Sequence, residues 1–200
     1  MSSFWNERYG AKNYVYGKEP NVFFAEQIDD LIPGMLILPC EGEGRNAVYA
    51  ATKGWDVEAF DLSVAGKSKA LQLAGKTKID ISYIIKDALN ASYPENKADV
   101  VAFIYAHFPP DIRSIIHKKA ISWLKPGGKM ILEAFNTLQL KNKSGGPKDL
   151  DMLYNTDMLL SDFQDLVTVL IQNVQTDLRE GKLHEGKADI VRYIGTKKKL

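Results

Sequence analysis

The segment from Met35 to Ala47, MLILPCEGEGRNA, is the feature that most constrains the fold of this chain. A short apolar run leads into a turn that contains Gly42 and Gly44, and an alanine-rich segment follows. Glycines lack the Cβ atom that keeps a ligand away from the main chain, and the start of a helix presents free backbone amides. The order of strand, glycine turn and helix therefore predicts a close approach of the backbone to a nucleoside-containing cofactor.

A carboxylate follows the next strand-like segment and supports this prediction. The run from Val57 to Phe60 is followed directly by Asp61, and a carboxylate at the end of a second strand suits the paired hydroxyls of a ribose. Nicotinamide- and flavin-dependent dehydrogenases share this arrangement with methyltransferases that use S-adenosylmethionine (SAM). The turn alone does not separate these classes, and a tight turn without a ligand is the structural alternative.

Strand-like and helix-like segments alternate as far as Ala134. Such alternation predicts a parallel sheet with right-handed crossovers and helices on both faces. The apolar run from Ala98 to Ile104 is typical of a parallel strand that is covered on both faces. Ser63 is placed to cap the third of the expected helices. The patterns place strands at 35–38, 56–60, 81–85, 98–104 and 129–134, and helices at 20–31, 47–53, 64–73 and 111–123.

The end of the chain has a different pattern. A short helix is expected at 156–163, and two strand-like stretches, 167–177 and 187–194, flank a turn at 179–182. Stretches joined in this way pair as an antiparallel hairpin. We therefore predict one α/β domain with an N-terminal lid and helix at 1–33, a cofactor-binding core at 34–135, and a substrate-side loop, helix and hairpin at 136–200.

Length and composition limit the classes of function. With 200 residues, of which 45% are hydrophobic, the chain can form one sizeable core. A formal net charge of +1 argues against a general attraction to nucleic acid or to an anionic membrane. The single cysteine, Cys40, excludes an internal disulfide, and no run approaches the ~20 apolar residues of a membrane span. We expect a cytoplasmic protein that is a monomer or a homodimer.

Five short motifs carry a family resemblance. The chain resembles the class I SAM-dependent methyltransferases, in particular the small group described as tellurite-resistance-like methyltransferases. The motif before the fifth strand, together with the terminal hairpin, separates this family from the dehydrogenases. The motifs are the glycine turn at 40–46, Asp61-Leu62-Ser63, Asp87-Ala88, Ala98-Asp99-Val100-Val101 and Leu124-Lys125-Pro126-Gly127-Gly128.

The resemblance implies a Rossmann-like fold with a mostly parallel seven-stranded sheet, an antiparallel last strand and helices on both faces. It also implies that SAM lies across the carboxyl ends of the first strands. Asp61 and Asp87 could instead cap the turns that follow them. By resemblance, Gly42 and Gly44 lie under the methionine part, Asp61 binds the ribose, Leu62 packs on the adenine, Asp87 and the Ala88 amide bind the adenine edge, and Tyr105 and Tyr16 contact the cofactor.

The chain departs from the family pattern at the end of the first strand. The family usually has an acidic residue where this chain has Leu38, and a glycine where it has Cys40. Glu41 is a candidate to replace the missing charge near the SAM amino group, beside Cys40 in the cofactor site. If Glu41 points to solvent instead, the chain is a weak binder or a non-catalytic relative.

Methyl transfer from a sulfonium needs mainly the alignment of nucleophile, methyl group and sulfur, so few catalytic side chains are expected. His107, after the fourth strand, is the candidate catalytic base and lies on the substrate side; alternatively it only fixes its Phe-Pro-Pro loop. His117 is expected on a helix surface. His184 can reach the substrate only if the hairpin bends back, and the histidines and Cys40 form no convincing metal site.

Aromatic residues are dense near the N-terminus, at Phe4, Trp5, Tyr9, Tyr14 and Tyr16. They either pack on the first helix as core or form a lid that excludes water, with Tyr16-Gly17 as the contact point and Trp5 beside the substrate. On the opposite side, Glu133 either orients the substrate or binds a nearby Arg or Lys.

These features together predict SAM-dependent methyl transfer to a small-molecule nucleophile, namely a thiol, amine, hydroxyl or oxyanion. No basic patch or stacking stripe suggests a nucleic acid. Two alternatives stay open: a non-catalytic SAM-binding or partner-binding module, and a nicotinamide-dependent oxidoreductase.

Overall fold

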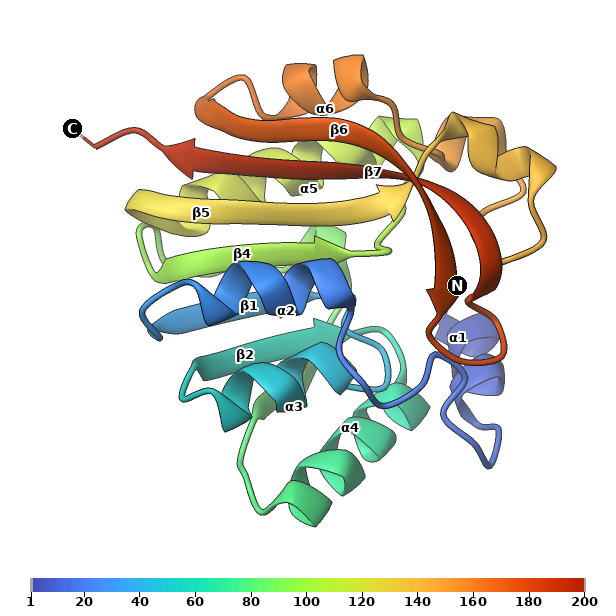
Figure 1. The fold of residues 1–200 in the computed structure, drawn as a ribbon. Helices are drawn as coiled ribbons and strands as arrows, with labels where there is room; N and C mark the ends of the chain where they lie inside the picture. The colour runs from blue at the N-terminus through green and yellow to red at the C-terminus, as the bar shows by residue number, and fades with distance from the viewer. Residues whose placement is uncertain (1, 200) are drawn as a thin grey trace.

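The computed structural model describes residues 2–199 and contains a seven-stranded sheet with the strand order β3-β2-β1-β4-β5-β7-β6 (Figure 1). Strands β1 to β5 are parallel, and β7 is antiparallel to both of its neighbours. The predicted sheet with an antiparallel last strand is confirmed. The strands are β1 (Met35–Pro39), β2 (Asp56–Asp61), β3 (Ser82–Ile85), β4 (Ala98–Ile104), β5 (Leu124–Phe135), β6 (Leu166–Arg179) and β7 (Glu185–Lys197).

Helices cover both faces of the sheet. In Figure 1, α2 and α3 lie in front of the strands and α5 and α6 behind them. Ser63 caps α4 as predicted, because its Oγ accepts a hydrogen bond from the Gly66 amide. The helices are α1 (Ser2–Tyr9), α2 (Val22–Asp29), α3 (Arg45–Thr52), α4 (Val64–Thr77), α5 (Pro110–Trp123) and α6 (Thr156–Asp162), with short 3-10 helices at Ala88–Asn90, Thr137–Lys141 and Leu150–Met152.

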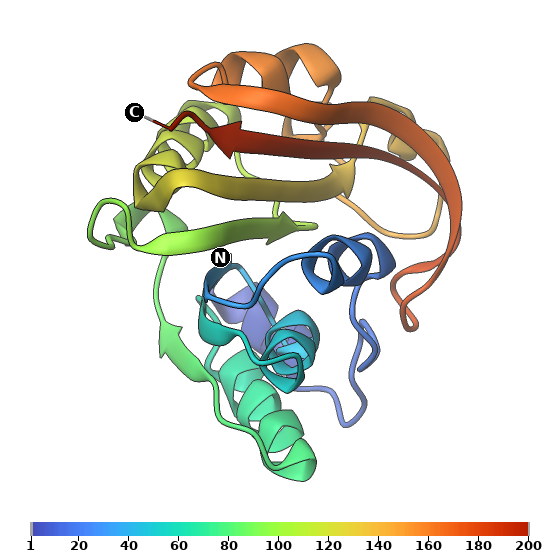
Figure 2. The same ribbon diagram turned by 60° about the vertical axis from the view of Figure 1, so that its left-hand side comes forward.

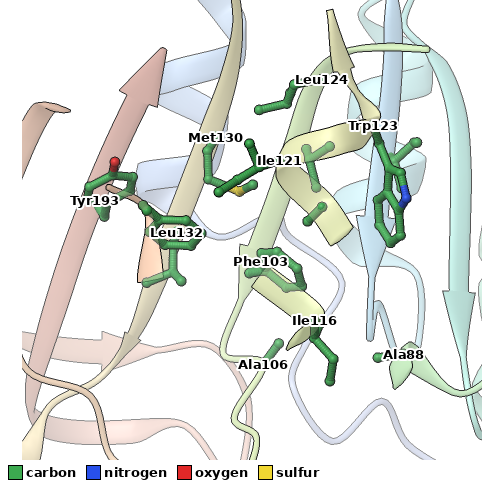
Figure 3. Packing of buried hydrophobic residues seen from close by; sticks show 14 of the residues in the cluster. Ala88, Phe103, Ala106, Ile116, Ile121, Trp123, Leu124, Met130, Leu132 and Tyr193 are labelled. Atoms are coloured by element: carbon green, nitrogen blue, oxygen red, sulfur yellow. The ribbon is translucent and has the colours of Figure 1, made fainter. Parts of the chain in front are cut away.

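Alternate side chains of the central strands fill two cores, one on each face. On the face covered by α5 and α6, Phe103 of β4 and Leu132 of β5 pack among residues of α5 such as Ile116 (Figure 3). On the other face, neighbouring strand positions pack against α2 and α3. Strands covered on both faces bury almost every side chain, which explains the continuous apolar runs in the sequence.

Two features differ from the predicted elements. Strand β5 begins at Leu124, within the motif that we expected to form a separate turn, and its pairing with β4 shifts register between Ala98 and Val100. Helix α1 was not predicted as a helix, because it buries only Tyr9 and so lacks an apolar periodicity. Among the described residues, no helix has the length and apolar character that crossing a membrane requires.

The β6–β7 hairpin is long and strongly curved. Figures 1 and 2 show it bending past the carboxyl ends of the parallel strands toward the N-terminal part of the chain. At its tip the amide of Leu183 donates to the Val15 carbonyl, 3.4 Å away. The hairpin therefore closes over the edge of the sheet at which the predicted cofactor residues lie.

Candidate functional site

The turn after β1 is buried and highly ordered by its own hydrogen bonds. One oxygen of the Glu41 carboxylate accepts from the backbone amides of Asn46 and Ala47, both at 2.8 Å, and so binds the N-terminus of α3. Burial raises the pKa of Glu41 to about 7. Glu41 thus does not point to solvent, while Leu38, where the family has an acid, is an apolar core residue that is 1% exposed.

Gly42 and Gly44 both have positive φ angles, of 62° and 87°. Protein atoms lie where a Cβ would project from each. At Gly42 that atom would come within 2.6 Å of the Tyr9 hydroxyl, and at Gly44 it would collide with Ala70 of α4. One reason for these glycines is therefore the close packing of α1 and α4 on the turn, which adds to the ligand approach expected from the sequence.

Side chains from three successive strand ends lie together beside this turn. Asp61 follows β2 and accepts from the amides of Gly42 (3.2 Å) and Ser63 (2.8 Å). Asp87 follows β3, and its Oδ1 accepts from the Leu89 amide at 2.7 Å. Burial, followed by the negative charges of Asp61 and Asp87, raises the pKa of the Cys40 thiol. Both aspartates therefore cap turns, as in the alternative interpretation, and the charges of both act on Cys40.

This arrangement fits the adenosine part of SAM. An ionised carboxylate offers about four acceptor positions, so the backbone amides leave capacity on Asp61 for ribose hydroxyls. Leu62 is half-buried and Ala88 is buried beside the two aspartates. The roles of these residues in cofactor binding stay predictions. The methionine end fits less well, because Leu38 carries no charge and the Glu41 oxygens already accept from the start of α3.

The His107 ring is fixed by the backbone on both sides. Its Nδ1 lies 2.7 Å from the Met152 carbonyl, and its Nε2 accepts from the Phe135 amide at 3.2 Å. Since Nε2 accepts, the ring proton is placed on Nδ1. Burial lowers the pKa of His107 to about 4, so the ring is neutral at pH 7. This geometry favours the loop-fixing interpretation over the catalytic one.

Glu133, at the end of β5, is the centre of a buried network and is 2% exposed. Its oxygens accept from Asn21 Nδ2 (2.6 Å), from the Tyr105 hydroxyl (3.0 Å) and from Arg192 Nε (2.7 Å). Of the two roles predicted for Glu133, the structure displays the pairing with an arginine. Tyr105 is thereby held at the carboxyl end of β4, with a positive φ of 53°.

The two remaining histidines are both buried. His117 is 0% exposed and its Nδ1 lies 2.8 Å from the Asp162 carboxylate, so the expected surface position was wrong. The cause is α6, which packs on the side of α5 that carries His117. The hairpin does bend back, and it places His184 against Tyr16 and Tyr105, with ring centroids 4.4 and 4.5 Å away.

The N-terminal aromatic residues lie over the glycine turn. Trp5 stacks on Tyr9 with ring centroids 5.3 Å apart, and Tyr9, which covers Gly42, is 5% exposed. Tyr16 lies farther along, where Arg8 donates to its hydroxyl at 2.9 Å. These positions support the lid interpretation for Tyr9 and Tyr16, whereas the contact of Trp5 with substrate stays a prediction.

Sequence reasoning missed a group of polar residues that join this lid to the turn. Glu43 Oε2 accepts from the Val15 amide at 2.8 Å, and Asn46 Oδ1 accepts from the Asn21 amide at 2.9 Å. Arg45 forms an ion pair with Glu180 at the hairpin tip. The available signal was the polar pair Arg45 and Asn46 directly after the glycine turn.

Comparison with known proteins finds one matching domain family over part of the chain. Residues 39–128, which include the glycine turn and the strand ends, match the family described as "Methyltransferase domain". This part of the chain is therefore similar to methyltransferase domains. The chain is 30% identical over 118 residues to phosphoethanolamine N-methyltransferase 3 of Arabidopsis thaliana. The match covers 58% of this chain and 24% of that relative, so the chain spans about a quarter of the curated protein.

Solved structures with the same fold are similar to this chain over nearly its whole length. A structure described as "Conversion of a Disulfide Bond into a Thioacetal Group during Echinomycin Biosynthesis" matches with a TM-score of 0.81 at 15% identity, over 99% of this chain and 92% of the other. TehB from Haemophilus influenzae matches with a TM-score of 0.72 at 17% identity, over 98% and 67%. A further methyltransferase of this fold was solved with SAM bound, the cofactor expected for the family.

Proposed function

We propose that this methyltransferase transfers the methyl group of SAM to a small-molecule nucleophile. The observation that carries the proposal is the pair of carboxylates, Asp61 and Asp87, at successive strand ends beside Cys40 and the glycine turn. The relative from Arabidopsis thaliana is by name a phosphoethanolamine methyltransferase, which supports a small acceptor. The net charge of +1 also favours a small molecule over a nucleic acid.

In this proposal the chain binds and orients, and SAM, when bound, supplies an activated methyl group. Asp61 binds the ribose, Asp87 and the Ala88 amide bind the adenine edge, and Leu62 packs on the base. Gly42 and Tyr16 lie at the methionine side. Alignment of this kind contributes up to about 7–11 kcal/mol to the lowering of a barrier between bound reactants.

The state of His107 bears on the class of acceptor. Both of its ring nitrogens bond to the backbone, and its pKa is lowered to about 4. Removal of a proton by this ring would first break the hydrogen bond from Phe135. We therefore favour an acceptor that arrives as an anion or a free amine, which needs no base, over a neutral hydroxyl.

One observation favours a second candidate, a SAM-binding module without turnover. Leu38 replaces the usual acid at the end of β1, and Glu41 is bonded to the start of α3. This second candidate predicts that the chain binds the cofactor but transfers no methyl group to any acceptor. A screen of thiols, amines, hydroxyl compounds and oxyanions, read out as S-adenosylhomocysteine (SAH) formed, separates the two candidates.

The first test is calorimetric titration of the full chain with SAM, SAH and NADH. We expect micromolar binding of the two sulfur nucleosides and none of NADH. Asp61→Asn should weaken SAH binding by roughly 1–3 kcal/mol, about fivefold to 150-fold in Kd, through lost charge-assisted hydrogen bonds. The matched control is Asp99→Asn, since Asp99 accepts from a backbone amide in the same way but lies at the opposite end of the parallel strands.

Equal SAH affinities of the wild type and Asp61→Asn would contradict the ribose assignment. Because Asp61 also accepts from two backbone amides, its variant is expected to unfold at a lower temperature. The titration is therefore run well below the melting temperature of every variant.

A further inference from the structure

The turn proposed to contact SAM is covered by other parts of the chain. All residues from Glu41 to Val48 are buried, and Tyr9 lies directly over Gly42. Asp61, the proposed ribose ligand, is 6% exposed. A nucleoside can reach these groups only if the covering segments move.

Next to Tyr9, two segments that lie far apart in the sequence contact Glu43 and Arg45 of this turn. We define these two segments, residues 10–21 and the hairpin tip at 180–184, as the cover. They meet through backbone. The Leu183 amide donates to the Val15 carbonyl, and a Cβ on Gly181 would come within 2.5 Å of the Gly17 amide nitrogen. Figures 1 and 2 both show the hairpin tip beside the chain that connects α1 to α2.

Arg45, the first residue of α3, holds both halves of the cover at once. One guanidinium nitrogen lies 2.8 Å from Glu180 Oε2 and the other donates to the Tyr16 carbonyl at 3.1 Å. The side chains of Arg45 and Glu180 are only 7% and 10% exposed. Water competes little with such a pair, and loss of either partner leaves the other charge buried and unpaired.

The rest of the cover is attached mainly by hydrogen bonds. Residues 10–21 form turns and bends, and most of them are exposed or half-buried. Glu43 accepts from the amides of Val15 and Tyr16, and Asn21 Nδ2 donates to Glu180 Oε1 at 2.9 Å. A segment with few buried apolar contacts opens locally at a far lower free energy than the sheet beneath it.

We propose that Arg45 is a positioning residue that keeps the cover closed, and that separation of Arg45 from Glu180 is the step that admits SAM and releases SAH. This inference rests on the proposed function in its cofactor part. The closed cover itself is a property of the ligand-free chain, so it can be tested apart from binding.

The test is amide hydrogen exchange, followed by mass spectrometry, on the full ligand-free chain. The variants are Arg45→Gln, Glu180→Gln and Arg45→Lys. The matched control is Arg113→Gln, because Arg113 forms a similarly buried pair with Asp162 (2.7 Å, 11% and 4% exposed) between α5 and α6. In parallel, the dissociation rate of labelled SAH is measured by a chase with unlabelled SAM.

We expect Arg45→Gln and Glu180→Gln to raise exchange at least tenfold in both halves of the cover, with β1, β4 and β5 unchanged. Arg45→Lys should restore part of the protection, because an ammonium can keep one of the two contacts. SAH dissociation should become at least tenfold faster in the two Gln variants and stay unchanged in Arg113→Gln. In the double variant Arg45→Gln/Glu180→Gln, the increase in exchange and in SAH dissociation should be smaller than the product of the two single-variant increases, because both substitutions remove the same interaction.

Two results would overturn the inference. One is unchanged exchange of the cover in both Gln variants. The other is faster exchange of the cover together with an unchanged SAH dissociation rate. If the cover responds as expected but the wild type binds neither SAM nor SAH, the closing role of Arg45 is supported and the proposed cofactor function fails.

Discussion

At the scale of single residues, His107 makes the stability of this protein depend on pH. Its folded pKa is about 4, below the usual 6.5, because burial disfavours the charged ring. Between these values the unfolded chain binds more protons than the folded chain, so the free energy of unfolding falls as the pH is lowered from 6.5 to 4. The full effect of this one group is about 3 kcal/mol.

His107→Asn should therefore lose less stability than the wild type between neutral pH and about pH 4.5. The measurement is urea unfolding of both proteins at each pH. Asn keeps a donor and an acceptor for Met152 and Phe135, so the variant is expected to fold. His117 and His184, whose pKa values are also lowered by burial, stay in place in both proteins, so the difference between the two profiles reports on His107. Parallel pH profiles of His107→Asn and the wild type would contradict a lowered pKa for His107.

Residue roles were predictable where the cause is local. Asp61 and Asp87 follow strands, and their place at one edge of the sheet follows from parallel topology alone. The roles of Glu43 and Arg45 were not predictable, because their partners lie in the lid and at position 180, far away in the sequence. A polar residue in a buried turn indicates that a hydrogen-bonding or ion-pair partner exists, but the local sequence does not identify that partner.

At the scale of elements, the β6–β7 hairpin offers a matched pair of glycines. Gly181 and Gly186 have φ angles of 93° and 97°, so alanine introduces the same backbone strain at each. A Cβ on Gly181 would collide with the backbone near Gly17, whereas on Gly186 it would meet no described atom within 4 Å.

Gly181→Ala is therefore expected to raise hydrogen exchange at residues 10–21 at least tenfold, and Gly186→Ala to leave it unchanged. Both variants should lose a similar, small amount of global stability, of about 1 kcal/mol, because both place an alanine at positive φ. The melting temperature measures the loss of stability that both variants share, and the exchange map measures the loss of protection at residues 10–21 that is specific to Gly181→Ala. Equal exchange at 10–21 in the two variants would mean that the close contact with Gly17 does not hold the segment.

Elements were predictable where apolar periodicity or an apolar run defines them, as in β4, whose bounds match the predicted 98–104. Helix α1 was missed because it buries a single residue, and the start of β5 because a Pro-Gly-Gly motif within a strand resembles a turn. The buried position of His117 depends on α6, which returns to pack on α5 from a later part of the chain. Such effects of distant packing leave no local pattern.

At the scale of the whole molecule, the sheet and its antiparallel last strand were predictable from the sequence. The curvature of the hairpin, which brings position 184 to Tyr16 and Tyr105, was not predictable. Because the hairpin is curved, its tip lies over the carboxyl ends of the parallel strands (Figures 1 and 2). The consequence is that access to the strand ends depends on two segments that share no sequence pattern.

The single thiol of the chain gives a direct measure of this access. Cys40 directly follows β1 and is half-buried, and burial, followed by the negative charges of Asp61 and Asp87, raises the pKa of its thiol, so little thiolate forms at neutral pH. We expect slow alkylation of the native protein by iodoacetamide, at least tenfold faster alkylation of Arg45→Gln, and protection of both by SAH. Mass spectrometry of the intact protein measures the extent of alkylation directly, because the single cysteine can take up one label.

Arg113→Gln again serves as the control, and we expect it to be alkylated at the wild-type rate. A wild-type rate in Arg45→Gln would show that the thiol is reached without opening the cover, and a rate unaffected by saturating SAH would place Cys40 outside the cofactor site.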